Sequence, residues 1–286
     1  MAADAAAVAL VNRALEEDLA QGVDVTSVAT VPDDAAGSAT LVARADGVVA
    51  GLDLVAEVYR QVDERVTVER IAADGDRVTR GDVVARVDGP LRAILTGERT
   101  ALNLVTHLSG VATATRAHVD AVAGTGCAVR DTRKTTPGMR LLEKAAVRAG
   151  GGVNHRVGLF DGLLVKDNHV VAAGSVTAAT RAALDAADGL PVQVEVDDLD
   201  QLREAIDAGA RDVLLDNFTP DLVRQAVTIV RALESVHGRI LLEASGTLRL
   251  DTVREYAEAG VDRVSVGAIT HSAPQLDLAL DIQPTR

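Results

Sequence analysis

The spacing of apolar residues changes about one third of the way along the chain. In the first third, apolar positions recur at helical spacing over residues 5–19 and 52–61. Short runs typical of strands, at 39–45 and 66–71, bracket the second of these segments. A long helical stretch follows at 97–123. This pattern predicts an N-terminal domain in which helices accompany a small sheet.

Beyond residue 123 short apolar runs alternate with helical segments such as 199–208 and 222–233. Strands buried on both faces that alternate with covering helices form parallel sheets, often closed into barrels. The sequence therefore predicts an α/β fold with a (β/α) barrel, incomplete at about six to seven strands. The expected strands are 127–130, 162–165, 192–196, 212–215, 240–242 and 261–266.

Composition narrows the classes of function. The chain has 286 residues, 48% of them hydrophobic, which is enough for one large and one smaller domain. A formal net charge of -13 and only four aromatic residues argue against a nucleic-acid partner. Apolar runs are too short for a membrane span and the acidic N-terminal segment is unlike a signal peptide, so we expect a cytoplasmic protein. The single Cys127 excludes an internal disulfide.

The three lysines of the chain indicate where its chemistry lies. Lys134, Lys144 and Lys166 all fall within residues 130–168, whereas arginine supplies every other basic side chain. That segment has a net charge of +4 in an otherwise acidic protein. A cationic cleft attracts a small anionic substrate. The alternative is a basic helix face packed against acidic neighbours.

Ionisable residues follow most of the expected barrel strands. Barrel enzymes place their active sites at the carboxyl ends of the strands, so this recurrence predicts a site there. A single charged strand end would more often be a solvated turn. The ionisable residues at these strand ends are Arg133, Lys134, Lys166, Glu195, Asp216 and Glu243. Ser245 and Gly246 follow Glu243, and Gly267 follows the last strand.

The basic residues suit a ligand that carries carboxylate and phosphate groups. Guanidinium groups bind carboxylates through two hydrogen bonds, which suits Arg133 and Arg156, and a protonated His155 would add a further donor. Lys134 and Lys166 can approach phosphate or a developing negative charge as point cations.

The acidic and glycine-containing strand ends suit other parts of such a ligand. Glu195 and Asp216 offer hard oxygen ligands for magnesium or acceptors for sugar hydroxyls. The loops at Ser245–Gly246 and at Gly267 can present backbone N–H groups to a phosphate. Gly150 to Gly152 are a stronger feature than these short glycine loops, and their alternative role is a plain helix stop followed by a loop.

Seven ordered motifs, together with two upstream segments, resemble the quinolinate phosphoribosyltransferase family, and the resemblance covers nearly the whole chain. The upstream segments are EDLAQGVDVTS (17–27) and GERTALNLVTHLSGVAT (97–113). The motifs are DTRKTTPGMR (131–140), GGGVNHR (150–156), LVKDNH (164–169), EVD (195–197), LLDNF (214–218), EASG (243–246) and VGAITHSAPQLDLALD (266–281).

This resemblance implies an activity, an architecture and an assembly. The activity converts quinolinate and phosphoribosyl pyrophosphate to nicotinate mononucleotide, pyrophosphate and carbon dioxide, with Mg2+, in NAD biosynthesis. The architecture is an N-terminal α+β open-faced sandwich domain at 1–110 and an α/β barrel at 111–272, with 273–286 returning to the sandwich. The assembly is a homodimer or a higher dimer-based oligomer, in which Arg99 reaches into the barrel of the neighbouring subunit.

The resemblance also implies roles for individual residues. Lys134, Lys166, Glu195 and Asp216 would be catalytic, and Glu195 and Asp216 would lie near the metal. The substrate-binding set would be Arg99, Arg133, Lys134, His155, Arg156, Lys166, Glu195, Asp216, Ser245, Gly246 and Gly267. The chain departs from the family at Val23, inserted between Gly22 and Asp24, and at Thr247, where the family usually has Gly or Asn.

Three other functions remain open at this stage. A paralogue, such as the molybdenum-associated relatives or a nicotinate-using phosphoribosyltransferase, would share the barrel and the phosphate site. A monocarboxylate substrate, however, does not need Arg99, Arg133, His155 and Arg156 together. A Schiff-base aldolase would use Lys166 as its nucleophile. A non-catalytic protein would bind the same anions without turnover.

Overall fold

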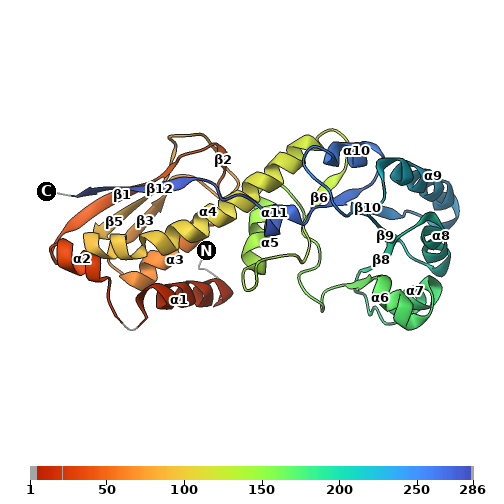
Figure 1. Cartoon of the computed structure of the whole chain (residues 1–286), viewed down its shortest axis with the longest axis horizontal. Helices are drawn as coiled ribbons and strands as arrows, with labels where there is room; N and C mark the ends of the chain where they lie inside the picture. Colours follow the sequence, from red (N-terminus) through yellow and green to blue (C-terminus); the bar gives the residue numbers. More distant parts are fainter. Residues whose placement is uncertain (1–4, 21, 285–286) are drawn as a thin grey trace. The chain divides into compact units, whose positions relative to one another are not determined.

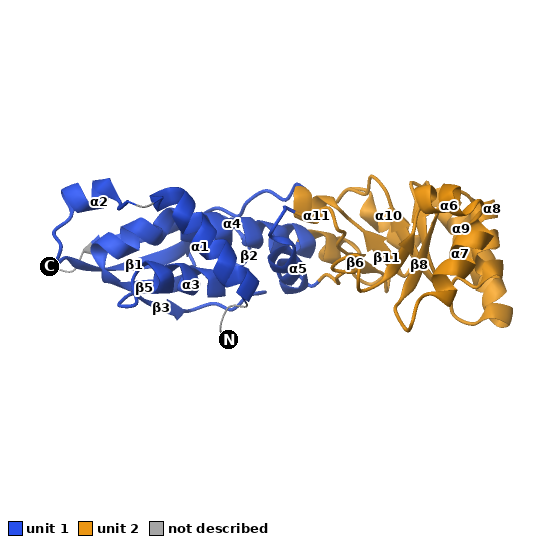
Figure 2. Cartoon of the chain, turned by 90° about the horizontal axis from the view of Figure 1, so that it is seen from below, with its two compact units in different colours: residues 1–116, 136–151, 272–286 blue, residues 117–135, 152–271 orange. Residues whose placement is uncertain are grey.

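The computed structural model describes residues 5–20 and 22–284, and the chain divides into two compact units (Figures 1 and 2). Unit 1 comprises residues 1–116, 136–151 and 272–286. Unit 2 comprises residues 117–135 and 152–271.

Unit 1 is built on a four-stranded antiparallel sheet with the strand order β12-β1-β5-β3. These strands are β1 (Ala36–Ala43), β3 (Thr67–Arg70), β5 (Val83–Pro90) and β12 (Leu278–Pro284). A separate pair joins β2 (Gly47–Val48) to β4 (Arg77–Val78). The helices are α1 (Ala5–Leu19), α2 (Val25–Thr30), α3 (Leu52–Val62), α5 (Arg140–Ala149) and most of α4 (Leu91–Ala121). This is the α+β sandwich that the family resemblance implied.

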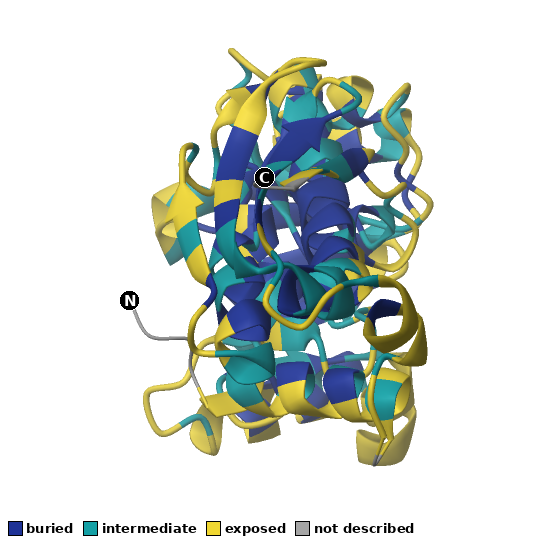
Figure 3. Ribbon diagram, turned by 90° about the vertical axis from the view of Figure 1, so that its left-hand side faces the viewer, coloured by how far each residue is buried: buried dark blue, intermediate teal, exposed yellow. Residues whose placement is uncertain are grey.

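The core of unit 1 forms where its helices meet the sheet. Side chains of β1 alternate between exposed or half-buried and buried positions at its start, as expected of a strand with one covered face. Buried residues, dark blue in Figure 3, gather in the interior of the molecule, and exposed ones lie on its outside. Leu41 in β1, Leu52 in α3 and Ile94 in α4 are each almost fully buried.

Helix α4 begins six residues earlier than the sequence pattern predicted. Gly97 was taken as its start, but this glycine lies within the helix. A Cβ atom at Gly97 would lie 2.8 Å from Cε1 of Tyr59, so the residue permits close packing between α3 and α4. Glycine therefore serves a packing role here and does not mark a helix end.

The end of the described chain lies in unit 1. Strand β12 pairs with β1 along its whole length, from Gly37 opposite Pro284 to Ala43 opposite Leu278. The backbone N–H of Leu276 donates to the carbonyl of Thr106 in α4, 3.0 Å away, just before this strand. The C-terminal segment thereby forms an edge of the sheet of unit 1.

Unit 2 is a parallel six-stranded sheet with helices on its outside (Figure 1). Its order is β6-β11-β10-β9-β8-β7, and among the described residues the two end strands do not pair, so the barrel is incomplete as predicted. The strands are β6 (Ala128–Arg130), β7 (Leu163–Val165), β8 (Val192–Val196), β9 (Asp212–Asp216), β10 (Leu241–Ser245) and β11 (Arg263–Ser265). The helices are α6 (Asp167–Ala173), α7 (Val176–Asp185), α8 (Leu199–Ala208), α9 (Pro220–His237), α10 (Val253–Glu258) and α11 (Ala268–His271).

Local sequence explains where several of these helices begin and end. Asp198 accepts hydrogen bonds from the backbone N–H groups of Asp200 and Gln201 at the start of α8. Gly209 ends the same helix in the left-handed conformation. Thr219 caps α9, with Pro220 in its first turn. The predicted bounds of α1, α8 and β8 agree with the structure.

Alternation along the barrel strands places polar side chains inside. In β8, Val194 and Val196 are fully buried, whereas Gln193 and Glu195 on the opposite face meet polar groups of neighbouring strands. The barrel interior therefore carries the chemistry. Within the described residues, no helix combines the length and the apolar character needed to cross a membrane.

Candidate active site

A cavity of about 500 Å3 lies at the carboxyl ends of the strands of unit 2. Nine of the predicted site residues line it: Arg133, Lys134, His155, Arg156, Lys166, Glu195, Asp216, Ser245 and Gly246. The remaining lining residues are Thr132, Leu164, Leu214, Asn217, Thr247 and Ser265. Side chains far apart in the sequence thus share one polar cavity, of a size that accommodates a small ligand.

The segment that carries His155 and Arg156 is held beside the end of β6. Val153 forms a parallel bridge with Arg130, and its carbonyl accepts a hydrogen bond from the backbone N–H of Asp131. The carboxylate of Asp131, which is fully buried, accepts from the backbone N–H of His155 at 2.7 Å and from the side chain of Asn154 at 2.6 Å. Asp131 therefore fixes the loop that brings the two basic residues to the cavity.

Arg133 and Arg156 carry donors that the protein leaves unused. The Nε atoms of both guanidinium groups are buried and have no hydrogen-bond partner among the described residues. Burial lowers the pKa of Arg156, and the nearby charge of Arg133 lowers it further. Buried donors are nearly always satisfied in proteins. The Nε atom of Arg116, which does not line this cavity, is also buried without a partner, so it is the joint position of Arg133 and Arg156 in one polar cavity that indicates an anionic ligand. The Nη1 of Arg156 donates to the carbonyl of Gly162 at 2.9 Å, which holds this side chain in place.

Lys166 forms an ion pair with Glu195 at the cavity wall. Burial raises the pKa of Glu195, an effect that the hydrogen bond and charge of Lys166 partly offset. The pair engages the amine that a Schiff-base aldolase would use as its nucleophile, which speaks against an aldolase.

Asn217 contacts both Asp216 and Gly246. The side-chain amide of Asn217 donates to the carboxylate of Asp216 at 2.7 Å, and its backbone N–H donates to the carbonyl of Ser245 at 3.0 Å. Gly246 has a φ of +124°, and a Cβ atom there would lie 2.4 Å from Oδ1 of Asn217. Only glycine fits this close approach. Thr247, the departure from the family pattern, lines the same cavity.

Gly267 and Lys134 lie side by side, although Gly267 itself is not among the lining residues. A Cβ atom on Gly267 would come within 3.2 Å of Cδ of Lys134. The hydroxyl of Thr270 donates to the backbone carbonyl of Lys134 at 2.8 Å and contacts that of Gly267 at 3.0 Å. These bonds join the loops that follow β6 and β11.

Several expectations need correction. Glu243 does not end its strand, because β10 continues to Ser245, and its side chain is fully buried below the cavity. Lys144 is buried in α5 of unit 1, so it packs on its helix and does not line the cavity. Both ring nitrogens of His155 hydrogen-bond within the protein, so the ring is engaged by the chain itself and does not offer the additional donor that was expected. Arg99 needs no correction: it is exposed on α4 in unit 1, and its role across a subunit interface stays a prediction.

Other residues that shape the site could not be identified as site residues from the sequence pattern. Asn217 follows Asp216 directly and has a left-handed φ of 54°, a conformation that asparagine tolerates better than most residues. Asp131 and Gln193 act through contacts with residues distant in sequence, which periodicity cannot reveal. His169 is exposed, and its Nδ1 accepts from the backbone N–H of Lys166 at the start of α6.

The carboxylates suit a magnesium ion shared with a substrate. No group of three or more His, Cys, Asp or Glu side chains among the described residues is arranged to hold a metal. Mg2+, however, is commonly bound through one or two carboxylates together with substrate phosphates. Glu195 and Asp216 line one cavity and provide such hard oxygen atoms, so the donor set fits the ion.

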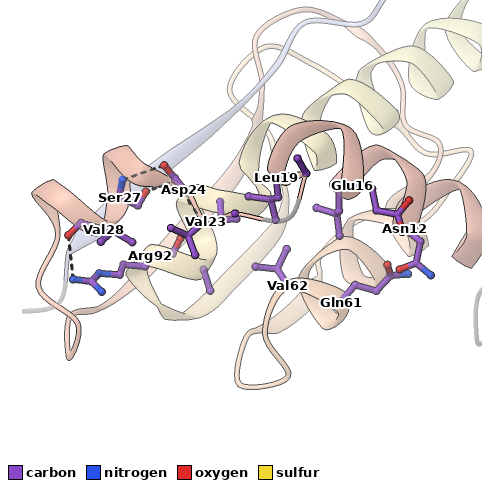
Figure 4. A pocket seen from close by; sticks show the side chains of 15 residues that line it. Asn12, Glu16, Leu19, Val23, Asp24, Ser27, Val28, Gln61, Val62 and Arg92 are labelled. Carbon is purple, nitrogen blue, oxygen red and sulfur yellow. Dashed lines mark hydrogen bonds between the residues drawn. The ribbon is translucent and has the colours of Figure 1, made fainter.

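Unit 1 contains a second cavity, of about 450 Å3, whose lining residues come from α1, α2, α3 and α4 and from the loop before α2 (Figure 4). Two of its three charged lining residues, Asp24 and Arg92, have partners within the unit. Asp24 caps α2 by accepting from the backbone N–H groups of Thr26 and Ser27. Arg92 donates to the carbonyl of Val31 and to Asp33, both at 2.9 Å.

Comparisons with known proteins agree with the site. The model of the quinolinate phosphoribosyl transferase C-terminal domain matches residues 111–281, and that of the N-terminal domain matches residues 24–109. The chain belongs to the quinolinate phosphoribosyltransferase family. All of the cavity residues fall within the part that matches the C-terminal domain of this family.

Individual relatives of the quinolinate phosphoribosyltransferase family match over nearly their full length. The chain is 48% identical over 275 residues to the "Nicotinate-nucleotide pyrophosphorylase [carboxylating]" of Mycobacterium leprae, covering 95% of each chain. It is 41% identical to the probable enzyme of that name from Bacillus subtilis, covering 96% of this chain and 92% of the relative. Among solved structures, the nicotinate-nucleotide pyrophosphorylase of Francisella tularensis has a TM-score of 0.91 at 38% identity, covering 97% and 96%.

Proposed function

We propose that the cavity of unit 2 transfers the phosphoribosyl group of phosphoribosyl pyrophosphate to quinolinate and that decarboxylation then gives nicotinate mononucleotide. The observation that carries this proposal is the pair of guanidinium groups of Arg133 and Arg156, whose buried Nε donors have no protein partner. Lys134 and Lys166 add two further cations to the same cavity. Family membership and the names of the relatives support the same reaction.

Quinolinate requires this concentration of positive charge. It carries two carboxylates on adjacent ring carbons, and moving both from water into a protein cavity is costly unless each is paired. Two guanidinium groups supply planar donors that match two carboxylates. Four cations against the two carboxylates of Glu195 and Asp216 leave the cavity with a surplus of positive charge.

The reaction then needs positioning more than proton transfer. The lone pair of the ring nitrogen forms a bond to C1′ of the ribose, and the C1′–O bond breaks with its electrons leaving on pyrophosphate. The bond from C2 of the ring to its carboxylate next breaks, carbon dioxide leaves, and the electron pair stays on C2 beside the positive nitrogen. C2 finally takes a proton from solvent. Lys134 and Lys166 are placed to stabilise the departing negative charge.

Mg2+ would assist through its charge on the phosphates of phosphoribosyl pyrophosphate. Glu195 and Asp216 are the residues that would hold it, directly or through water. The ion pair with Lys166 keeps the carboxylate of Glu195 oriented at the cavity wall. Ser245, Gly246 and Gly267 would provide backbone donors for the 5′-phosphate of the ribose.

We further propose a homodimer or a dimer-based oligomer, acting in the cytoplasm. Arg99 is exposed on α4 and has no role in the core of unit 1. In the dimer, the Arg99 side chain of one subunit would complete the carboxylate site of the other. An Arg99→Ala subunit mixed with an Arg133→Ala subunit would then restore activity, because one of the two sites in such a dimer would be intact.

The function is tested by incubating the purified protein with quinolinate, phosphoribosyl pyrophosphate and Mg2+ and measuring nicotinate mononucleotide and carbon dioxide. A parallel reaction contains nicotinate in place of quinolinate. We expect equal amounts of both products from quinolinate and none from nicotinate. Turnover of nicotinate alone would mean that the cavity had been assigned the wrong anion.

A further inference from the structure

A buried polar cluster lies directly below the catalytic cavity, inside the barrel. It joins Gln193 of β8, Asp212 of β9 and Glu243 of β10, three neighbouring strands of the sheet. Gln193 is 5% exposed and Glu243 is fully buried. The proposed reaction uses none of these side chains.

Glu243 is a carboxylate in spite of its burial. Burial alone would raise its pKa, but the charge of Arg130 and the hydrogen bond from Ser265 hold the pKa of Glu243 below its ordinary value. Arg130 Nη1 donates to Oε2 of Glu243 at 2.6 Å, and Arg263 pairs with both Glu243 and Asp212. The cluster is therefore a fixed arrangement of charges.

These carboxylates determine how the amide of Gln193 is turned. Its Nε2 donates to Oδ1 of Asp212 at 2.8 Å and to Oε2 of Glu243 at 2.9 Å. Both hydrogens of the amide are thereby used. The reverse orientation would direct the amide oxygen at two carboxylates, which only accept hydrogen bonds. Oε1 of Gln193 must therefore face the other way, toward the ring of His155.

The amide oxygen in turn determines where His155 carries its proton. Oε1 of Gln193 lies 2.9 Å from Nε2 of His155, and an amide oxygen can only accept, so Nε2 bears the hydrogen. Nδ1 of the same ring accepts a hydrogen bond from the backbone N–H of Arg156 at 2.7 Å, so it bears none. The two contacts together specify the neutral imidazole with its proton on Nε2.

We propose that Gln193 is a positioning residue, which holds the imidazole of His155 in this one tautomer and orientation at the wall of the substrate cavity. Positive charge for the substrate then comes from Arg133, Arg156 and the lysines, while His155 presents a neutral ring. The hydrogen bond from Arg156 to the same ring makes His155 a link between the buried cluster and a carboxylate-binding guanidinium. The kinetic part of this inference rests on the proposed function, and the tautomer does not.

The tautomer is tested directly by NMR of the full-length protein labelled with 15N in its histidines. The His155 signals are assigned by their loss in His155→Asn. At neutral pH we expect an Nδ1 shift typical of an unprotonated ring nitrogen and an Nε2 shift typical of a protonated one. A proton on Nδ1, or on both nitrogens, would overturn the proposal without reference to any activity.

The role of Gln193 is tested with Gln193→Leu and with Gln193→Met, which keeps the length of the side chain but lacks the amide. We expect the His155 signals to move toward a mixture of tautomers and the KM for quinolinate to rise roughly tenfold, with kcat and the KM for phosphoribosyl pyrophosphate changed much less. Gln61→Leu is the matched control, because Gln61 is a glutamine of unit 1 that bonds to Val8 and Glu57. It should leave both the His155 signals and the KM unchanged.

The two readouts separate the possible failures. If the wild-type protein does not turn over quinolinate, the proposed function fails, while the NMR result still decides the tautomer. If both Gln193 variants fold and the His155 signals stay at their wild-type positions, Gln193 does not set the tautomer. If those signals move but the KM for quinolinate equals that of Gln61→Leu, the positioning role is wrong.

Discussion

The unit 1 cavity and the unit 2 active-site cavity are similar in size but differ in how their arginine side chains are satisfied. In the unit 1 cavity of Figure 4, Arg92 donates hydrogen bonds to the carbonyls of Val28 and Val31 and to the carboxylate of Asp33. In the unit 2 cavity, the Nε atoms of Arg133 and Arg156 are buried without any partner among the described residues. In the unit 1 cavity the guanidinium is satisfied by the protein, whereas in the unit 2 cavity two buried donors remain for a ligand.

Volume alone therefore does not mark the active site. The unit 1 cavity does contain one unsatisfied buried atom, Oε1 of Gln61, but it is a single neutral oxygen. Leaving a buried donor unsatisfied costs about 1–3 kcal/mol, and more when the group is charged. Two such donors in one cavity are therefore the observation that supports the proposed anion site.

The largest effect should follow from Arg133→Ala, which removes one of the two guanidinium groups whose buried Nε has no partner among the described residues. We expect kcat/KM for quinolinate to fall by roughly 10²-fold or more, because a preorganised charge that meets the reacting anion is lost. Steady-state kinetics measures this. Arg92→Ala is the matched control from unit 1 and should lose about 1–2 kcal/mol of stability while keeping its kcat/KM. Equal losses of activity in the two variants would remove the distinction between the cavities.

Asp216→Asn should have the next largest effect, because it removes one of the two carboxylates proposed to hold Mg2+. We expect kcat/KM to fall by roughly 10- to 100-fold and the Mg2+ concentration for half-maximal rate to rise. Titrating the activity with Mg2+ separates these changes. Asp221→Asn, at an exposed position in α9, serves as the control for the loss of one negative charge. An unchanged Mg2+ requirement in Asp216→Asn would exclude Asp216 as a metal-binding residue.

Gly246→Ala should raise the KM for phosphoribosyl pyrophosphate by about tenfold, because the new Cβ would displace Asn217 and shift the phosphate loop. Gly238→Ala is matched to it, since Gly238 also has a positive φ but nothing lies within 4 Å of its Cβ position. That control should lose about 1 kcal/mol of stability from backbone strain and keep its KM. Similar KM values for both variants would show that strain alone, and not the contact with Asn217, matters at Gly246.

The smallest effect on activity should come from Asp24→Ala in the unit 1 cavity. Losing the cap of α2 should cost about 1 kcal/mol of unfolding free energy without a change in kcat. The hydrogen bond from Ser27 lowers the pKa of Asp24 below its ordinary value of 3.8. A depressed carboxyl pKa stabilises the fold at neutral pH and loses this effect as the pH falls below 3.8. The stability gap between wild type and variant should therefore narrow in acid, as measured by urea unfolding, and a constant gap would contradict the ionic contribution.

The contrast between the cavities also shows which parts of the site the sequence could predict. Lys166, Glu195 and Asp216 were identified because each lies at or just beyond the end of an apolar run, and parallel strands bring such ends together. Gly97 misled the prediction of α4 because the partner that requires a glycine there, Tyr59, is distant in sequence. Glycine at a helix–helix contact and glycine at a helix end are indistinguishable in a single sequence.

The spacing of apolar residues also could not predict the polar interior of the barrel, because the partners of its polar side chains are distant in the sequence. Glu243 was expected at a strand end, but its two arginine partners allow it to remain charged inside the sheet. His155 was expected to be protonated, and its contacts with Gln193 and the backbone of Arg156 are the basis for the proposed neutral tautomer. Protonation and tautomer depend on partners that the fold assembles, so they follow from the structure and not from the residue types.

The central claim is that the cations of the unit 2 cavity form a site for two carboxylates. Isothermal titration calorimetry of the wild-type protein with quinolinate and with nicotinate, which lacks one carboxylate, tests it most directly. Quinolinate should bind at least about 100-fold more tightly, since its second carboxylate pairs with a guanidinium whose buried Nε otherwise has no partner among the described residues. Equal affinities for the two compounds would contradict it.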